Sequence, residues 1–497
     1  MKMDLGIAAE VKRQQRNMLL AFAAAALVAV IAAAVSPIGY IGAGWDDQQY
    51  LAATRCWVAH GAPCVPIAHW WTRWPLVASM AAFSGLLGES RFSIQLAPGL
   101  WWGLALLMTG WLANAWFGWR AAAVAIVLLG TAPIIAFNAF DPNADVAELA
   151  LQLSALAVAT VAYKRQSRAA GFVAGVVAGL AVQTRDTSIL FVGASAAVWL
   201  TLPRGKRNVL LWAVGGVVSA ELAEMLVYAI GAGDPFLRWR LALGHTNIGT
   251  NQLPEGFHSS RGPILNPDYI RSWKREMHIT LWWPIDPWLN LLASPHTGMM
   301  LGSGGIALAF LGRRLDREER RRAARLLCGA LLISVGLIYV LAIDPKTRMF
   351  MSLYAAVAIA GGAAIARGFR DEAKPVAAIL LVIPAVAGIY LMNKYVTSAP
   401  AEAWARQTVA RYGEDIEVFP GAESYLTFVP EVRALPPIGS GRRYLLTTAG
   451  GTCEQLIDKR PGHANGVVID RFFAQGNLCL FEYLPVRPSV IARSRRP

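Results

Sequence analysis

Apolar runs of about 16 to 25 residues alternate with short polar connections along most of the chain. A helix of roughly 20 apolar residues spans the hydrocarbon core of a bilayer, so these runs have the length of membrane-crossing segments. The pattern predicts about eleven transmembrane helices. They cover residues 18–40, 92–116, 120–139, 145–163, 169–184, 187–203, 208–232, 293–311, 323–343, 349–366 and 375–393.

Composition supports a polytopic membrane protein. Of the 497 residues, 55% are hydrophobic and 16% are charged, whereas soluble domains carry roughly 25% charged residues. The net charge of +14 would suggest a nucleic-acid partner in a soluble protein, but here Lys and Arg occur in short clusters between the apolar runs. We therefore interpret the charge as a signal of membrane topology and expect no nucleic-acid partner.

The distribution of basic residues predicts an orientation. A basic tail precedes the first apolar run, which is too long for the core of a cleaved signal peptide, so we expect a retained helix with a cytoplasmic N-terminus. The connection 313–325 contains seven arginines and falls on the same predicted side, as do the other strongly basic connections. The sequence thus predicts a multi-pass membrane protein with its N-terminus in the cytoplasm.

Three longer segments then lie on the outer side, at residues 41–91, 233–292 and 394–497. The last of these loses the apolar bias and shows short alternating runs bounded by Gly or Pro, a pattern typical of strands. We expect a transmembrane domain over residues 1–393 and a small periplasmic α/β domain over residues 394–497. The predicted fold class is an all-α polytopic membrane protein with this small C-terminal extracytoplasmic α/β domain.

The cysteines agree with that sidedness. Cys56 and Cys64 share the first outer segment, Cys453 and Cys479 share the tail, and Cys328 stands alone in a predicted helix. Two disulfides in an oxidising compartment are the economical interpretation, and free buried thiols are the alternative.

Within the membrane part, glycines recur every fourth residue at Gly171, Gly175 and Gly179. Small residues at this spacing let two membrane helices approach closely. We interpret the spacing as a packing surface without chemistry.

Common catalytic motifs are missing: the sequence has no GxxxxGK phosphate loop, no HExxH zinc helix and no GxSxG elbow. The candidate chemistry is instead charge at membrane borders. Asp46 and Asp47 follow the first apolar run, with Tyr50 close behind. A carboxylate fixed at the outer surface can act as a general base toward a lipid-borne substrate, while the simpler alternative makes Asp46 the N-cap of an interfacial helix.

Three further borders carry cations. Arg73 stands among Trp residues, where it is either an interfacial anchor or a bidentate phosphate ligand. Arg185 precedes an aspartate at a break between two runs, where an ion pair closing a tight turn is the alternative to ligand binding. Lys346 and Arg348 occupy an outer border that the positive-inside rule disfavours, and an anionic ligand would explain them.

Two acids enter a predicted helix one turn apart, at Asp145 and Glu148. Asp145 can serve as a helix cap, but ionisable groups entering a membrane helix indicate function by default. The histidine spacings match no metal motif, so we expect no required cofactor and keep a divalent metal as the alternative.

Taken in order, these motifs resemble the GT-C glycosyltransferases that use polyprenyl-phosphate sugars, especially lipid A aminoarabinose transferases and protein O-mannosyltransferases. Residues 46–50 are similar to their D-E-x-x-Y pattern, with Asp47 in place of Glu. Residues 73–76 are similar to K-P-P-L, and residues 184–186 to T-K-G, each with Arg in place of Lys. Asp145 matches the second acid of the family and Arg348 the arginine of R-Y-x-x-P. The resemblance is continuous over residues 36–203 and patchy to 366.

The resemblance implies inverting transfer of a hexose or pentose from an undecaprenyl-phosphate-like donor. The acceptor would be a lipid, a protein or a glycan of the cell envelope, such as lipopolysaccharide, at the outer side of the inner membrane. Four cations would bind the donor phosphate: Arg73, Arg185, Lys346 and Arg348. The catalytic group would comprise Asp46, Asp47 and Asp145, supported by Tyr50. Two alternatives stay open at this point, an O-antigen polymerase or ligase and a polytopic transporter or flippase.

Overall fold

The computed structural model describes residues 16, 19–20, 22–32, 45–202, 208–244, 279, 281–282, 284–341, 347–370, 372–392, 398–418, 426, 428–437, 440, 442–449, 466–472 and 477–483. The chain forms two compact units. The first comprises Met1–Gly39 and Gln49–Tyr395, and the second comprises Tyr40–Gln48 and Val396–Pro497.

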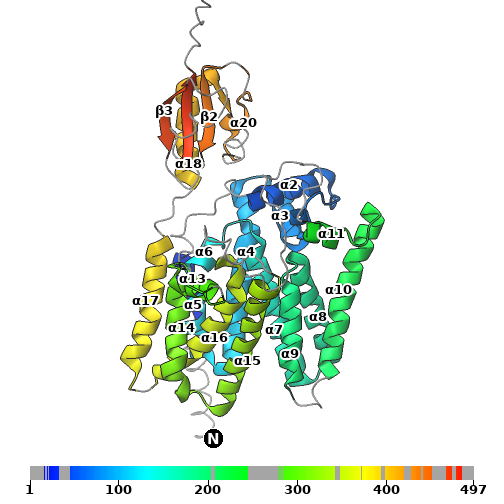
Figure 1. Cartoon of the computed structure of the whole chain (residues 1–497), viewed down its shortest axis with the longest axis vertical. Coiled ribbons are helices and arrows are strands. Elements are labelled where there is room, and N and C mark those ends of the chain that lie inside the picture. Colours follow the sequence, from blue (N-terminus) through cyan, green and yellow to red (C-terminus); the bar gives the residue numbers. More distant parts are fainter. Residues whose placement is uncertain are drawn as a thin grey trace, which may run out of the picture. The chain divides into compact units, whose positions relative to one another are not determined.

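The first unit is helical (Figure 1), with α2, α3 and α11 together at one end of the longer helices. After a helix over Phe22–Ala32, the elements are α2 (Trp45–His60), η1 (His69–Thr72), α3 (Trp74–Leu87), α4 (Arg91–Phe117), α5 (Trp119–Gly130), α6 (Pro133–Phe137), α7 (Ala144–Arg165), α8 (Arg168–Thr184), α9 (Ser188–Leu200), α10 (Asn208–Ala232), α11 (Leu237–Gly244), α13 (Asp286–Ala293), α14 (Gly298–Leu311), η4 (Gly312–Arg314), α15 (Arg317–Val335), η5 (Gly336–Val340), η6 (Thr347–Phe350), α16 (Met351–Gly368) and α17 (Lys374–Met392).

Each of the eleven predicted apolar runs carries a helix. Among the described residues, six helices are long and apolar enough to cross a membrane: α4, α7, α10, α15 with η5, α16 with η6, and α17. Shorter apolar helices include α5, α8 and α9, and also α3, which lies in a segment that the hydropathy pattern left outside the membrane. The predicted fold class is confirmed as a multi-pass helical membrane protein, and the number of spans stays a prediction.

Local sequence sets where several helices begin. Ser90 and Ser93 form a capping box at α4, and Asp316 and Glu319 form another at α15. Both boxes satisfy backbone N–H groups that have no partner inside the helix. The run predicted over residues 120–139 is divided into α5 and α6, because Pro133 disfavours helical geometry at the residue before it.

Helix α16 lies at the centre of the first unit, with 89% of its apolar window buried. It packs against α4, α5, α14, α15 and α17. Gly361 lets its backbone approach α14, since an added Cβ would lie 2.7 Å from the Cα of Gly304. Dispersion contacts at such short separations stabilise helix pairs in lipid, where the hydrophobic effect contributes little.

The glycine surface predicted on α8 is confirmed. It packs against α10, and an added Cβ at Gly175 would lie 1.9 Å from the carbonyl oxygen of Ala213. The contact is reciprocal, because a Cβ at Gly216 would lie 2.1 Å from the carbonyl oxygen of Phe172. The close contact between α8 and α10 therefore depends on glycine, which has no side chain, at these positions of both helices.

The second unit contains a small sheet beside helices. Its elements are α18 (Ser398–Tyr412), η7 (Gly413–Asp415), β1 (Ile416–Val418), α20 (Pro430–Arg433), β2 (Tyr444–Ala449), β3 (Gly466–Phe472) and β4 (Asn477–Tyr483). The described strands form one sheet in the order β1-β2-β4-β3, with β1 and β2 parallel and the other neighbours antiparallel. Leu446, Leu478 and Leu480 pack in one core with Ile416 and Val418.

The structure joins Cys56 and Cys64 by a disulfide. Cys479 on β4 is also disulfide-bonded, and Cys453, the partner expected for it, lies outside the described residues. Cys328 is the free cysteine of the described part of the chain and is exposed on α15.

Candidate active site

A buried carboxylate marks the beginning of α7. The N-cap is Asn143, whose side-chain oxygen accepts a hydrogen bond of 3.3 Å from the backbone N–H of Asp145. Asp145 is therefore not the helix cap, although its place in the first turn suits the positive end of the helix dipole. Its exposed fraction is 2%. A carboxylate buried this deeply needs a cationic partner.

Arg185 supplies that partner. It is the C-cap of α8, and its extended backbone, with φ −159°, directs the chain away from the helix axis. Its guanidinium forms an ion pair with Asp145, contacts the sulfur of Met349 and lies 3.8 Å from Oε2 of Glu148. The ion pair of Arg185 thus joins the end of α8 to α7, whereas the alternative drawn from the sequence was a pair with the adjacent aspartate.

A second guanidinium comes from a segment much further along the chain. Arg348, in η6, places Nε 3.7 Å from Oδ2 of Asp145. The Arg348 side chain is 29% exposed, compared with 9% for Arg185. Asp145 is thus flanked by two arginines, one buried and one partly accessible. Lys346, also predicted for this site, lies outside the described residues.

Glu148, one turn further along α7, is a site residue that the sequence-based assignment of roles left out. Its Oε1 accepts hydrogen bonds from Gln152 at 3.1 Å, from Thr187 at 3.0 Å and from Ser188 at 2.7 Å. Gln152 also accepts a bond of 2.6 Å from Ser352 on α16. The network ties α7, the start of α9 and α16 together around one carboxylate.

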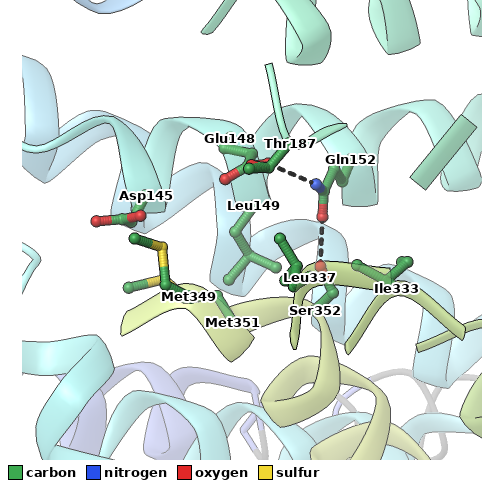
Figure 2. Close-up of a pocket in the computed structure, with 10 residues that line it drawn as sticks. All are labelled: Asp145, Glu148, Leu149, Gln152, Thr187, Ile333, Leu337, Met349, Met351 and Ser352. Atoms are coloured by element: carbon green, nitrogen blue, oxygen red, sulfur yellow. Dashed lines mark hydrogen bonds between the residues drawn. The ribbon is translucent and has the colours of Figure 1, made fainter. Parts of the chain in front are cut away.

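These side chains line a small pocket (Figure 2), with the carboxylates of Asp145 and Glu148 on one side and apolar and methionine side chains on the other. The lining residues are Asp145, Glu148, Leu149, Gln152, Thr187, Ile333, Leu337, Met349, Met351 and Ser352. Acidic, amide and hydroxyl groups thus meet apolar groups at the border of a membrane helix.

Arg73 contacts Tyr50, another predicted residue. Its guanidinium donates a hydrogen bond to the buried Tyr50 hydroxyl and lies 5.7 Å from the centre of the ring. The next residue, Trp74, donates a bond of 3.2 Å to Gln183, two positions before Arg185. Arg73 also interacts electrostatically with Glu148. The segment that holds Arg73 is therefore connected to the end of α8 that presents Arg185.

Asp46 and Asp47 lie in the first turn of α2. The helix begins at Trp45, so Asp46 is a helical residue and not the N-cap that the simpler interpretation made it. Asp47 is buried and accepts a 3.0 Å hydrogen bond from the backbone N–H of Gln48, while Asp46 is partly exposed. Both belong to the second compact unit, and their catalytic role stays a prediction.

One group of metal-ligand type is found among the described residues, formed by Cys56, His60 and Cys64, with ligand atoms within 4.8 Å of one another. The two sulfurs are joined in a disulfide. Cysteine binds metals as the thiolate, and a disulfide contains no thiolate. The two cysteines therefore cannot act as metal ligands while they are joined.

The fold matches known membrane enzymes, although no protein-family model matches the chain and no curated protein is similar to it in sequence. An Archaeoglobus fulgidus oligosaccharyltransferase tethered with an acceptor peptide has a TM-score of 0.54 at 12% identity, over 86% of this chain and 69% of that one. The same enzyme in complex with Zn and sulfate gives 0.51 at 15% identity, over 85% and 67%. ArnT from Cupriavidus metallidurans bound to undecaprenyl phosphate gives 0.42 at 15% identity, over 93% and 97%. The chain therefore shares the GT-C fold of that oligosaccharyltransferase.

Proposed function

We propose that this protein is an inverting glycosyltransferase that moves a sugar from a polyprenyl-phosphate donor to a lipid, glycan or protein acceptor on the outer side of the inner membrane. The observation that carries the proposal is the convergence of Arg185 and Arg348 on buried Asp145. The GT-C fold and the order of the sequence motifs support the same activity.

Sugar transfer from a lipid phosphate requires cations at fixed positions beside that phosphate. As the bond between the anomeric carbon and the phosphate oxygen breaks, negative charge grows on the departing lipid phosphate. Guanidinium groups held in a partly dry site stabilise that charge without reorganising. Arg185 and Arg348 fill this role, with Arg73 as a third cation. Under this proposal the donor phosphate competes with Asp145 for the two arginines that lie beside it.

The acceptor oxygen attacks the opposite face of the anomeric carbon, which inverts the configuration. A hydroxyl acceptor must lose its proton, and a carboxylate can receive it as general base. Asp46 is our assignment for that base, with Asp47 as its neighbour. An acceptor phosphate is already ionised and would need only orientation.

We expect Asp46→Asn to abolish transfer, because it removes the base with almost no change in volume. The purified protein would be incubated with undecaprenyl-phosphate-linked glucose, mannose or aminoarabinose and a bacterial envelope extract, and released undecaprenyl phosphate would be measured. Asp47→Asn should be milder. Glu318→Gln, which changes an exposed acid on α15, should behave like the wild type.

Near-normal release by Asp46→Asn would remove Asp46 from the mechanism, and the reverse order of the two aspartates would make Asp47 the base. If the wild type releases undecaprenyl phosphate from none of the donors, the proposed function itself is wrong.

A further inference from the structure

A buried arginine outside the Asp145 group is held by two helices and a turn. Arg238 on α11 is 2% exposed, and its guanidinium lies 2.8 Å from Glu224 and 3.4 Å from Glu221, both on α10. It also donates to the carbonyl oxygen of Val182 near the end of α8. Its fourth contact is a 2.8 Å ion pair with Asp186, in the turn between α8 and α9.

Three carboxylates lie within 3.4 Å of this one guanidinium. Burial alone would lower the pKa of Arg238, but the carboxylates of Asp186, Glu224 and Glu221 outweigh it and raise that pKa, so the side chain stays charged. Glu224 is nearly as buried as Arg238, with 6% of its side chain exposed, whereas Asp186 is 31% exposed. Of the three carboxylates, Asp186 raises the pKa of Arg238 the most, so the Asp186–Arg238 ion pair is a principal link between the turn and α11.

What the Asp186 contact fixes is the position of the α8–α9 turn. Asp186 directly follows Arg185, and the turn is narrow, with the N–H of Ser188 bonded to the carbonyl of Arg185 at 2.9 Å. On one side of the turn Arg185 reaches Asp145 and Met349. On the other side Asp186 reaches Arg238. Two neighbouring residues are thus tied to opposite parts of the protein.

We infer that Arg238, acting through Asp186, is a positioning element that holds Arg185 in place to receive the donor phosphate. The inference rests on the proposed function. A guanidinium whose backbone is held needs no reorganisation when the phosphate arrives, so fixing the turn improves binding and charge stabilisation without any direct contact with the donor. In its absence the turn would keep its hydrogen bonds but lose its anchor on α11.

The test breaks the contact at Asp186, because Arg238→Gln would leave buried Glu224 and partly buried Glu221 without their cation and would endanger folding. Asp186→Ala leaves Arg238 paired with Glu221 and Glu224. Binding of undecaprenyl phosphate would be measured on the full-length protein in nanodiscs for the wild type, Asp186→Ala, Asp186→Asn, Arg185→Ala and the Asp186→Ala/Arg185→Ala double variant. Glu318→Ala, which breaks an exposed pair on α15, is the matched control.

We expect Asp186→Ala to weaken binding about tenfold, a coupling typical of residues in one network, with no change in thermal stability beyond that of the control. Asp186→Asn, which keeps the acceptor oxygen, should recover part of the loss. In the absence of Arg185 the Asp186→Ala change should have no further effect, since it acts through Arg185.

Wild-type affinity in Asp186→Ala, or losses that simply add in the double variant, would overturn the positioning role and leave the proposed function standing. A wild type that binds no undecaprenyl phosphate would overturn the proposed function and this inference with it.

Discussion

At the scale of single residues, the central question is how much free energy it costs to separate Asp145 from Arg185. A buried ion pair is costly to break unless another charge replaces the lost partner. A donor phosphate is such a replacement, because its oxygens match the planar fork of arginine. The Met349 sulfur beside Arg185 offers no competing charge. Under the proposed function we therefore expect the donor phosphate to compete with Asp145 for Arg185, while Arg348 also lies beside Asp145.

Arg185→Ala should lower turnover more than donor affinity, because the contact strengthens as charge develops on the leaving phosphate. Losing one such fixed contact typically costs about 3 kcal/mol, on the order of a hundredfold in rate. Arg185→Lys should retain part of the activity, since a cation remains. Single-turnover transfer and undecaprenyl phosphate binding would be measured on the same preparations.

The control for this series is Arg443→Ala, which removes an exposed arginine of the second unit that pairs with Glu482. Equal losses in turnover and affinity would mean that Arg185 only holds the lipid. No loss in either would mean that Arg185 is a structural partner of Asp145 and nothing more.

An ionisable side chain that interrupts an apolar run can be singled out from the sequence. Asp145, Arg185 and Arg348 stand out in this way, and the structure brings them together, while their roles stay predictions. The role of Glu148 and the Arg238–Asp186 contact depend on partners from distant helices, which no local spacing reveals. An Arg185–Asp186 ion pair was the alternative to ligand binding, and in the structure Arg185 pairs with Asp145 and Asp186 pairs with Arg238.

At the scale of elements, the α8–α10 contact supports the geometry just described. Helix α8 ends at Thr184, directly before Arg185, and α10 carries Glu221 and Glu224. Their backbones approach closely because Gly175 and Gly216 carry no side chain at the contact. A change in this separation would move the Arg238 anchor relative to the turn.

Gly216→Ala should destabilise the protein, since its Cβ would meet backbone that cannot yield at 2.1 Å. Overpacking of this kind typically costs about 1–3 kcal/mol. The neighbouring Gly215→Ala is the matched control, because nothing lies within 4 Å of an added Cβ there. Thermal unfolding in detergent should show a lower midpoint for the first variant and an unchanged or higher one for the second. Equal midpoints would mean that α8 and α10 are less closely packed than described.

Helices were predictable because long apolar runs leave few alternatives in a membrane. The places where a helix is interrupted were harder to predict from the sequence. Pro133 divides one apolar run into α5 and α6, and a π-helical turn, η5, follows α15. In the second unit, alternating residues indicated strands, but the order β1-β2-β4-β3 depends on contacts between segments far apart in sequence.

At the scale of the whole molecule, hydropathy and charge predicted the fold class, because a bilayer imposes its thickness and its asymmetry on the entire chain. They do not predict a site assembled by helix packing. Asp145, Arg185 and Arg348 come from α7, the end of α8 and η6, and only the folded unit shows that two cations share one carboxylate.

The most direct test of this account is the position of a bound phosphate. A cryo-electron microscopy structure of the full-length protein in nanodiscs with undecaprenyl phosphate would give it. We expect the phosphate within hydrogen-bond distance of the Arg185 and Arg348 guanidinium groups, with Asp145 displaced from Arg185. A phosphate bound elsewhere, with the Arg185–Asp145 pair intact, would contradict the account.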